Sequence, residues 1–174
     1  MSCLRTFAEN RSLGYVALLG TVLSVALPAT AQVTGGPFQY FAVTPCRIAD
    51  TRNASFNAMG PYNGPPKQPA GPYRLIKVKE NCGIPVDAAA VSLNAAVLNP
   101  STHGFFSLWP AGGTFPVVST INFQAYEPGL ANGAIVPLAA GTALDLNIVY
   151  GNDDPPGAPV ALMDFILDVT GYFK

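Results

Sequence analysis

The sequence predicts an all-β domain, built as an antiparallel two-sheet sandwich or jelly roll of about eight strands. Its 174 residues include 17 glycines and 17 prolines, a content that disfavours long helices. Short apolar runs alternate with turn clusters throughout the chain. The connections between these runs are also short, which favours antiparallel pairing because a parallel crossover needs about a dozen residues or more. A closed β-barrel is the alternative architecture.

The candidate strands are the apolar runs bounded by glycine, proline, asparagine or aspartate. In chain order they are Phe38–Val43, Tyr73–Lys79, Ala89–Leu98, Phe105–Trp109, Val117–Phe123, Gly133–Leu138, Leu144–Tyr150 and Ala161–Phe173. Pro137 has no backbone N–H to donate, so we expect its strand to lie at a sheet edge or to contain a bulge.

Two of these runs show the two-residue period of a strand. From residue 144 to 150, apolar residues alternate with a mostly polar set, which predicts a half-buried strand. In the last run, one face is apolar throughout and consists of Ala161, Met163, Phe165, Leu167 and Val169. The opposite face is mixed, and we expect a loop or a neighbouring subunit to cover it. Its residues are Leu162, Asp164, Ile166, Asp168 and Thr170.

The first 31 residues have the three-part plan of a secretory signal peptide. Arg5 and Arg11 precede an uncharged stretch over residues 12–27, and small residues follow before Gln32. The uncharged stretch is shorter than the ~20 residues of a membrane-spanning helix, although a retained membrane anchor is the alternative. We therefore expect a cleaved signal peptide over residues 1–31 and one secreted domain over residues 32–174, extracellular or on the cell surface, with no membrane span.

Cleavage would remove Cys3 and leave Cys46 and Cys82 in an oxidising compartment, which predicts one disulfide between them. A redox-active or metal-binding pair is the alternative. It is disfavoured because the sequence has no Cys-x-x-Cys and its only histidine is His103. We expect the bridge to help order the proline-rich loop over residues 50–72.

The balance of charge excludes a polybasic nucleic-acid binder. The chain has 10 acidic and 9 basic residues and a formal charge of −1. No cofactor and no metal site are expected from its motifs.

The segment Phe41–Arg52 contains Thr44-Pro45-Cys46-Arg47 followed by Asp50-Thr51-Arg52. It resembles the opening motif of a functionally uncharacterised secreted β-rich module that is common in soil bacteria, especially acidobacteria and actinobacteria. Further landmarks of that module are matched in order by residues 82–85, 90–94, 104–110, 119–123, 131–133 and 168–173. The resemblance implies secretion and a β-rich fold, and it implies no activity.

Asp50 and Arg52 are one residue apart, so in an extended segment both side chains point to the same side. A structural ion pair that holds the loop after Cys46 is the expected role. The alternative is a ligand site, in which Arg47 adds a second guanidinium and the group receives an anion or a sugar acid.

Three asparagines, Asn94, Asn122 and Asn132, lie at or beside apolar runs, where an amide must find hydrogen-bond partners. One interpretation is structural, with each amide bonded to backbone. The other is a polar cluster that recognises the hydroxyl groups of a glycan beside aromatic platforms. The candidate platforms are Trp109, Tyr126 and Tyr150.

No catalytic residue is predicted, because catalysis needs convergent carboxylates or a nucleophile with its base. Asp164 and Asp168 share a strand face but lie too far apart to act together. His103 has no nucleophile context, so we expect a surface or turn-capping histidine. Residues 152–154, Asn-Asp-Asp, are expected to form an Asx turn, with a calcium site as the alternative.

The sequence therefore predicts a non-catalytic surface or matrix module that adheres to extracellular polysaccharide or assembles with copies of itself. Carbohydrate binding predicts an exposed aromatic shelf with amides beside it. Self-assembly predicts an exposed apolar face, for which Leu162 and Ile166 are the candidates. A secreted carbohydrate-active hydrolase is the alternative function, and it would need two carboxylates in one cleft, for instance Asp50 with Asp145.

Overall fold

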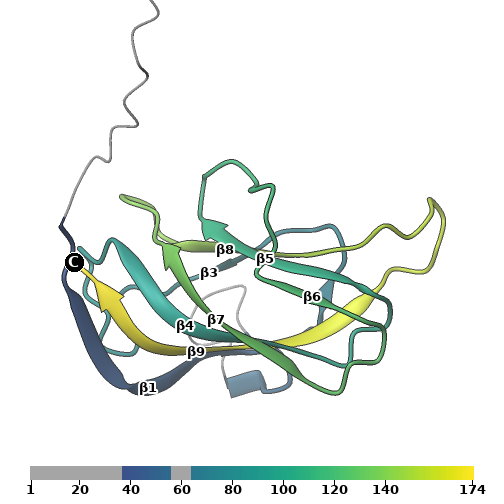
Figure 1. The fold of residues 1–174 in the computed structure, drawn as a ribbon, viewed down its shortest axis with the longest axis horizontal. Coiled ribbons are helices and arrows are strands. Elements are labelled where there is room, and N and C mark those ends of the chain that lie inside the picture. The colour runs from purple at the N-terminus through teal and green to yellow at the C-terminus, as the bar shows by residue number, and fades with distance from the viewer. Residues whose placement is uncertain (1–36, 56–63) are drawn as a thin grey trace, which may run out of the picture. The chain divides into compact units, whose positions relative to one another are not determined.

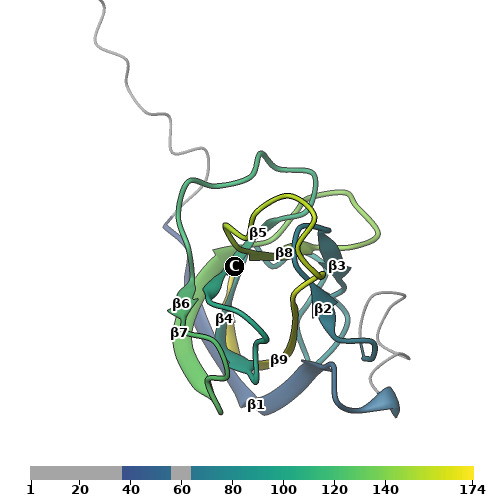
Figure 2. The same ribbon diagram turned by 90° about the vertical axis from the view of Figure 1, so that its right-hand side faces the viewer.

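The computed structural model describes residues 37–55 and 64–174, and the expected signal peptide over residues 1–31 lies outside them. The described chain contains nine strands: β1 (Tyr40–Asp50), β2 (Gln68–Pro69), β3 (Arg74–Ile76), β4 (Ala90–Leu98), β5 (Gly104–Pro110), β6 (Ile121–Phe123), β7 (Leu130–Pro137), β8 (Leu146–Gly151) and β9 (Leu162–Phe173). Figure 1 labels all of them except β2, which is labelled in Figure 2. Each of the eight expected runs overlaps one strand, but β1 continues to Asp50, well past the expected end at Val43, and β2 is an addition. Within these described ranges, no helix is long and apolar enough to cross a membrane.

The strands form two antiparallel sheets, as the sequence predicts (Figure 1, Figure 2). The first sheet has the order β1-β9-β4-β7, with β2 also paired to β9, and the second has the order β3-β8-β5-β6. The described strands do not close into a barrel, so the barrel alternative is wrong. β7 is the last strand of its sheet, which confirms the edge position expected from Pro137.

The core lies between the two sheets, and β9 supplies much of it. Met163, Phe165, Leu167 and Val169 are fully buried, as their alternation predicts. The ring of Phe165 lies 5.6 Å from that of Phe106 in the opposite sheet. Burial of each such side chain contributes roughly 1.5–3 kcal/mol, so this strand is a principal source of stability.

β8 differs from the half-buried strand that its alternation predicts, because both of its faces are covered. Asp145, directly before β8, and Asn147 within it are only 2% and 7% exposed. The carboxylate of Asp145 accepts hydrogen bonds from the backbone N–H groups of Val78 and Lys79, both at 2.8 Å. The Asn147 amide donates to the carbonyl of Pro110 at 3.3 Å. These polar residues satisfy buried backbone groups instead of facing water.

The part of the mixed face of β9 around Asp164 and Ile166 is covered, with contacts from the loop that follows β1, which is one of the two expected outcomes; Leu162 stays 41% exposed. Asp164 and Ile166 are each 7% exposed. The Thr51 hydroxyl donates to Asp164 Oδ1 at 2.8 Å, and Lys67 Nζ lies 2.6 Å from Asp164 Oδ2. Because Ile166 is buried, Leu162 and Ile166 do not form the exposed apolar face expected for self-assembly, which corrects that expectation.

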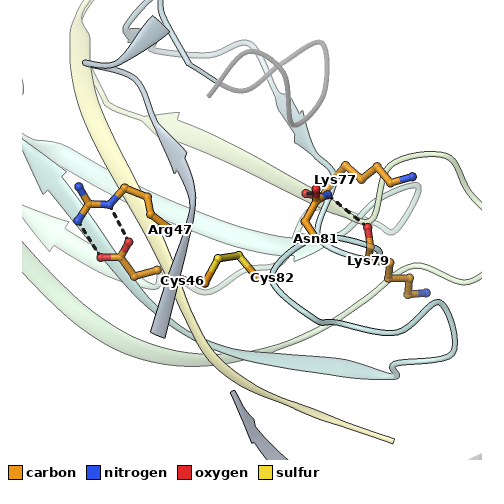
Figure 3. Close-up of a disulfide and its surroundings, with 7 residues drawn as sticks. Cys46, Arg47, Lys77, Lys79, Asn81 and Cys82 are labelled. Carbon is orange, nitrogen blue, oxygen red and sulfur yellow. Dashed lines mark hydrogen bonds and ion pairs between the residues drawn. A yellow bond between two sulfur atoms is a disulfide. The ribbon is translucent and has the colours of Figure 1, made fainter. Parts of the chain in front are cut away.

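Cys46 and Cys82 form the expected disulfide, with a Cα–Cα distance of 5.7 Å. The bridge ties β1 to the tight turn around residue 82, on the opposite side of the strand from Arg47 (Figure 3). In that turn Glu80 and Cys82 have left-handed φ angles of 64° and 53°. A bridge that closes a loop of 36 residues stabilises the fold by about 3–4 kcal/mol on a loop-entropy basis.

The described part of the proline-rich loop is anchored by one buried cation. Arg74 is 8% exposed and donates to the carbonyl groups of Gly64 at 3.0 Å and Pro66 at 2.6 Å. Burial lowers the pKa of its guanidinium. The side chain therefore replaces water as the partner of these carbonyls and fixes the chain where it enters β2. Residues 56–63 of the same loop lie outside the described residues.

Candidate functional site

The structure places the expected ligand-binding residues in three separate regions. On the outer face of the first sheet, or at its end, lie Asp50, Arg52 and Asn94. The outer face of the second sheet carries Trp109 and Asn122. The third region comprises the turn before β7 and β7 itself, which carry Tyr126 and Asn132.

On the outer face of the first sheet, the charged groups neutralise one another. Arg47 makes a two-pronged contact with Asp168, at 2.8 and 3.1 Å, and also reaches Asp50 at 3.1 Å. Arg52 contacts both oxygens of Asp50 at 3.0 Å. Its hydrogen bond to Asp50 is the main cause that lowers the pKa of this carboxyl. Paired contacts of this kind fit the structural ion pair, because both guanidinium groups are already engaged.

Asn94 lies on the same outer face, across from Gly133 of β7. It borders a shallow hollow of about 490 Å³ together with Ser92 and Thr170. Those two hydroxyl groups lie 3.0 Å apart and bond to each other. The described residues that line this hollow are aliphatic, hydroxyl-bearing or small apart from Asn94, so it offers a sugar ring no aromatic surface.

The outer face of the second sheet instead carries an aromatic shelf, which we define as Tyr73, Phe105, Trp109 and Phe115. The Trp109 ring centroid lies 4.9 Å from that of Tyr73 and 5.3 Å from that of Phe115, both in edge-on contacts. The Phe105 and Phe115 centroids are 6.4 Å apart. Tyr73 and Phe115 are 56% and 39% exposed, so the shelf presents ring surface to solvent.

Trp109 supports this shelf from beneath. It is 3% exposed, and its Nε1–H donates to the carbonyl of Gly113 at 3.1 Å. The loop over residues 111–120 arches out from β5 (Figure 1) and folds back on the sheet, where Ser107 Oγ donates to the carbonyl of Val118 at 2.9 Å. The expectation that Trp109 is an exposed platform is therefore corrected, because this loop covers its ring.

Phe105 sits at the centre of the face. In the sheet register it pairs with Asn122 of β6 on one side and with Gly151 of β8 on the other. Its ring occupies the space that a Cβ atom at residue 151 would fill. The absence of a side chain at Gly151 thus lets the ring lie across the backbone of β8. Asn122 is exposed, so an aromatic ring and a free-standing amide lie side by side.

Two hollows meet at Phe105 and Asn122. One is a cleft of about 590 Å³, whose polar lining consists of His103, Asn122, Gln124, Glu127, Asn152 and Asp153. The other holds about 290 Å³ and is lined mainly by apolar residues of the loop, among them Phe115, Val117 and Val118. The face therefore combines apolar surface with a small set of polar groups, which is the usual composition of a ligand site.

The polar groups at the cleft's far wall form local pairs. His103 Nε2 lies 2.6 Å from Asp153 Oδ1, and both side chains are more than half exposed. The Asn152 amide donates to Asp154 Oδ2 at 2.6 Å, a contact between side chains and not the bond from a backbone N–H to the asparagine oxygen that defines the expected Asx turn. In the described part of the chain, histidine, cysteine and carboxylate side chains form no group of three or more that could hold a metal ion.

The remaining candidates do not join this face. Tyr150 is fully buried, and its hydroxyl donates to the Thr102 carbonyl at 2.9 Å, which corrects its expected role as a platform. Tyr126 is 76% exposed in the turn between β6 and β7, where its φ is 60°. The Asn132 amide donates to the Thr120 carbonyl at 2.9 Å, so it joins the edges of the two sheets.

Sequence reasoning missed Tyr73, Phe105 and Phe115. A signal for Phe105 was present, because the two-residue period of β5 places it on the same face as Trp109. A second signal is the absence of any charged residue from Gly104 to Tyr126. Phe115 carries no such signal, since its place depends on how the loop folds back.

Comparisons of the chain with protein-family models, with curated proteins and with solved structures found no match. The resemblance to the secreted soil-bacterial module therefore stays a prediction.

Proposed function

We propose that this chain is a non-catalytic extracellular module that binds polysaccharide across the aromatic shelf and the adjoining cleft. The observation that carries the proposal is the pairing of Phe105 with an exposed Asn122 where the two hollows meet. An aromatic ring offers an apolar surface to the C–H face of a sugar ring. The amide both donates and accepts hydrogen bonds, as hydroxyl groups require.

The absence of charge favours a neutral polymer over an acidic one. No charged residue occurs between residues 104 and 126, which supply most of the face. The acidic residues that line the cleft are Glu127 and Asp153, and its basic residue is His103. A uronic acid would meet carboxylates there, and like charges repel. A neutral glycan would avoid that cost.

The test is binding of the purified protein to a panel of neutral and acidic polysaccharides, measured by affinity electrophoresis and calorimetry. We expect Phe105→Ala and Asn122→Ala each to weaken binding by about tenfold, which corresponds to about 1.4 kcal/mol. Matched controls on the other sheet are Phe41→Ala, which removes an exposed ring stacked on Tyr172, and Asn94→Ala. Equal losses in the controls, or no polysaccharide bound by the wild type, would contradict the proposal.

A secreted hydrolase is the second candidate, because Glu127 and Asp153 line one cleft together with His103. The pair suggested by the sequence is less suitable. Asp50 is held by two arginines, and Asp145 is buried against backbone N–H groups. New reducing ends released from a bound polysaccharide, and lost in Glu127→Gln, would favour the hydrolase over the binding module.

We also propose that the protein is exported from the cell. The signal-like segment predicts that mass spectrometry of the exported protein finds Gln32 at the N-terminus. An exported chain that still begins at Met1 would contradict the cleavage.

A further inference from the structure

The four edges of the two sheets differ in how they are protected against pairing with another chain. An edge strand leaves a row of backbone N–H and C=O groups without partners, so it is a template for pairing with another chain. Soluble proteins usually prevent such pairing with short edge strands, bulges, charged residues or proline. In the described chain, one edge of the first sheet is β1 together with the two-residue β2, which also pairs with β9, and the other is β7; the edges of the second sheet are β3 and β6.

Three of these edges carry such protection. The pairing of β1 with β9 is interrupted by two register shifts, between Ala42 and Cys46 and between Arg47 and Ala49. β1 also contains Pro45 and the charged Arg47. β3 and β6 are each only three residues long, and β3 begins with the buried Arg74.

β7 lacks these features except for a proline at its last position, although its Asn132 side chain also bonds to the Thr120 carbonyl next to β6. It has eight residues, with the sequence LANGAIVP and no charge. All eight pair with β4 in one unbroken register. The first four residues, 130–133, are exposed, and Ile135 is 65% exposed. A regular, uncharged and accessible edge of this length is unusual for a chain that stays single.

We infer that β7 pairs with β7 of a second copy of this chain, antiparallel and with Gly133 opposite Gly133. This register sets the exposed Ile135 against the exposed Ala131 of the second copy, so that a large side chain meets a smaller one, while Val136 stays buried in the core of its own copy. A strand without charge meets no like charge when it pairs with itself, whereas a charged partner strand would find no counter-charge on β7. The contact is two-fold symmetric and closed, and it joins the first sheets of both copies.

The test introduces charge on facing positions. We compare the wild type with two double variants, Ala131→Lys with Ile135→Lys and Ala131→Glu with Ile135→Glu, by light scattering on a sizing column. The wild type should have twice the monomer mass. Each variant alone should be a monomer, because like charges face each other across the two-fold axis, and an equal mixture should restore the dimer. The matched control is Val86→Lys with Val160→Lys, which adds the same charge at positions 65% and 68% exposed and should remain a dimer.

A wild type that is monomeric at every concentration overturns the inference. So does a lysine variant that stays dimeric, or a mixture that stays monomeric. Amide hydrogen exchange of the wild type needs no variant and guards against misfolding of the substituted chains. Exchange in residues 130–136 should slow as concentration rises, and exchange independent of concentration also overturns the pairing. None of these readouts depends on polysaccharide, so failure here leaves the proposed function separately testable.

Discussion

On the outer face of the first sheet, Arg47, Asp50, Arg52 and Asp168 hold one another in paired contacts of 2.8–3.1 Å. On the outer face of the second sheet, Tyr73, Phe115 and Asn122 point exposed surface at solvent without such pairing. The charged groups on the first sheet satisfy one another, so we infer that they stabilise the fold. The exposed groups on the second sheet have no such partners among the described residues and can contact a ligand. Polar residues alone therefore do not indicate a binding face. A polar side chain is available to a ligand only where its hydrogen-bonding groups are not already paired within the protein.

The largest effect is expected from removing the disulfide, which we assign to stabilising the fold and not to binding. Replacing both Cys46 and Cys82 with serine should lower the free energy of unfolding by about 2–5 kcal/mol, because the unfolded chain gains the freedom of the opened loop. Chemical denaturation measures the loss, and reduction of the wild type should reproduce it. Polysaccharide affinity of the folded variant should stay the same, since neither cysteine lines the two hollows of the proposed binding face. An unchanged denaturation midpoint would show that the core suffices without the bridge.

The next effect concerns the ion pairs. Because Arg52 lowers the pKa of Asp50 in the folded state, the carboxylate stabilises the fold fully above the unfolded pKa of about 4. That contribution is lost as pH falls through the lower folded pKa. We expect Asp50→Asn to cost about 1–3 kcal/mol at neutral pH and to flatten the stability profile below about pH 4. Glu80→Gln is the control. Lys77 lowers the pKa of Glu80 as well, but this pair is exposed and screened by solvent, so the profile should change much less than in Asp50→Asn.

The smallest effect on stability is expected at the proposed binding face. Val117 is fully exposed at the rim of the apolar hollow. Val117→Ser should change stability by less than about 0.5 kcal/mol, because no buried contact is lost. Its polysaccharide affinity should fall, but by less than in Phe105→Ala. A melting temperature that drops while affinity holds would reverse the assignment of this loop to the binding face.

Most strand positions were predictable because the apolar runs and turn residues are local signals, although β2 and the second half of β1 were not predicted. The burial of β8 was not, because the partners of Asp145 are the backbone N–H groups of Val78 and Lys79, far away in the sequence. The charge of Asp145 predicts that its carboxylate accepts hydrogen bonds, but it does not predict whether water or backbone N–H groups donate them. Trp109 shows the same limit, since its position on the outer face followed from alternation while its burial depended on a loop.

The contact between Phe105 and Gly151 has a consequence for how the chain tolerates variation. Since the Phe105 ring lies where a Cβ at residue 151 would stand, the residue tolerated at one position depends on the residue at the other. Alanine at 151 would displace the ring, whereas a small residue at 105 would release that constraint. A library that randomises both positions and selects for folded protein should recover glycine at 151 whenever an aromatic residue occupies 105.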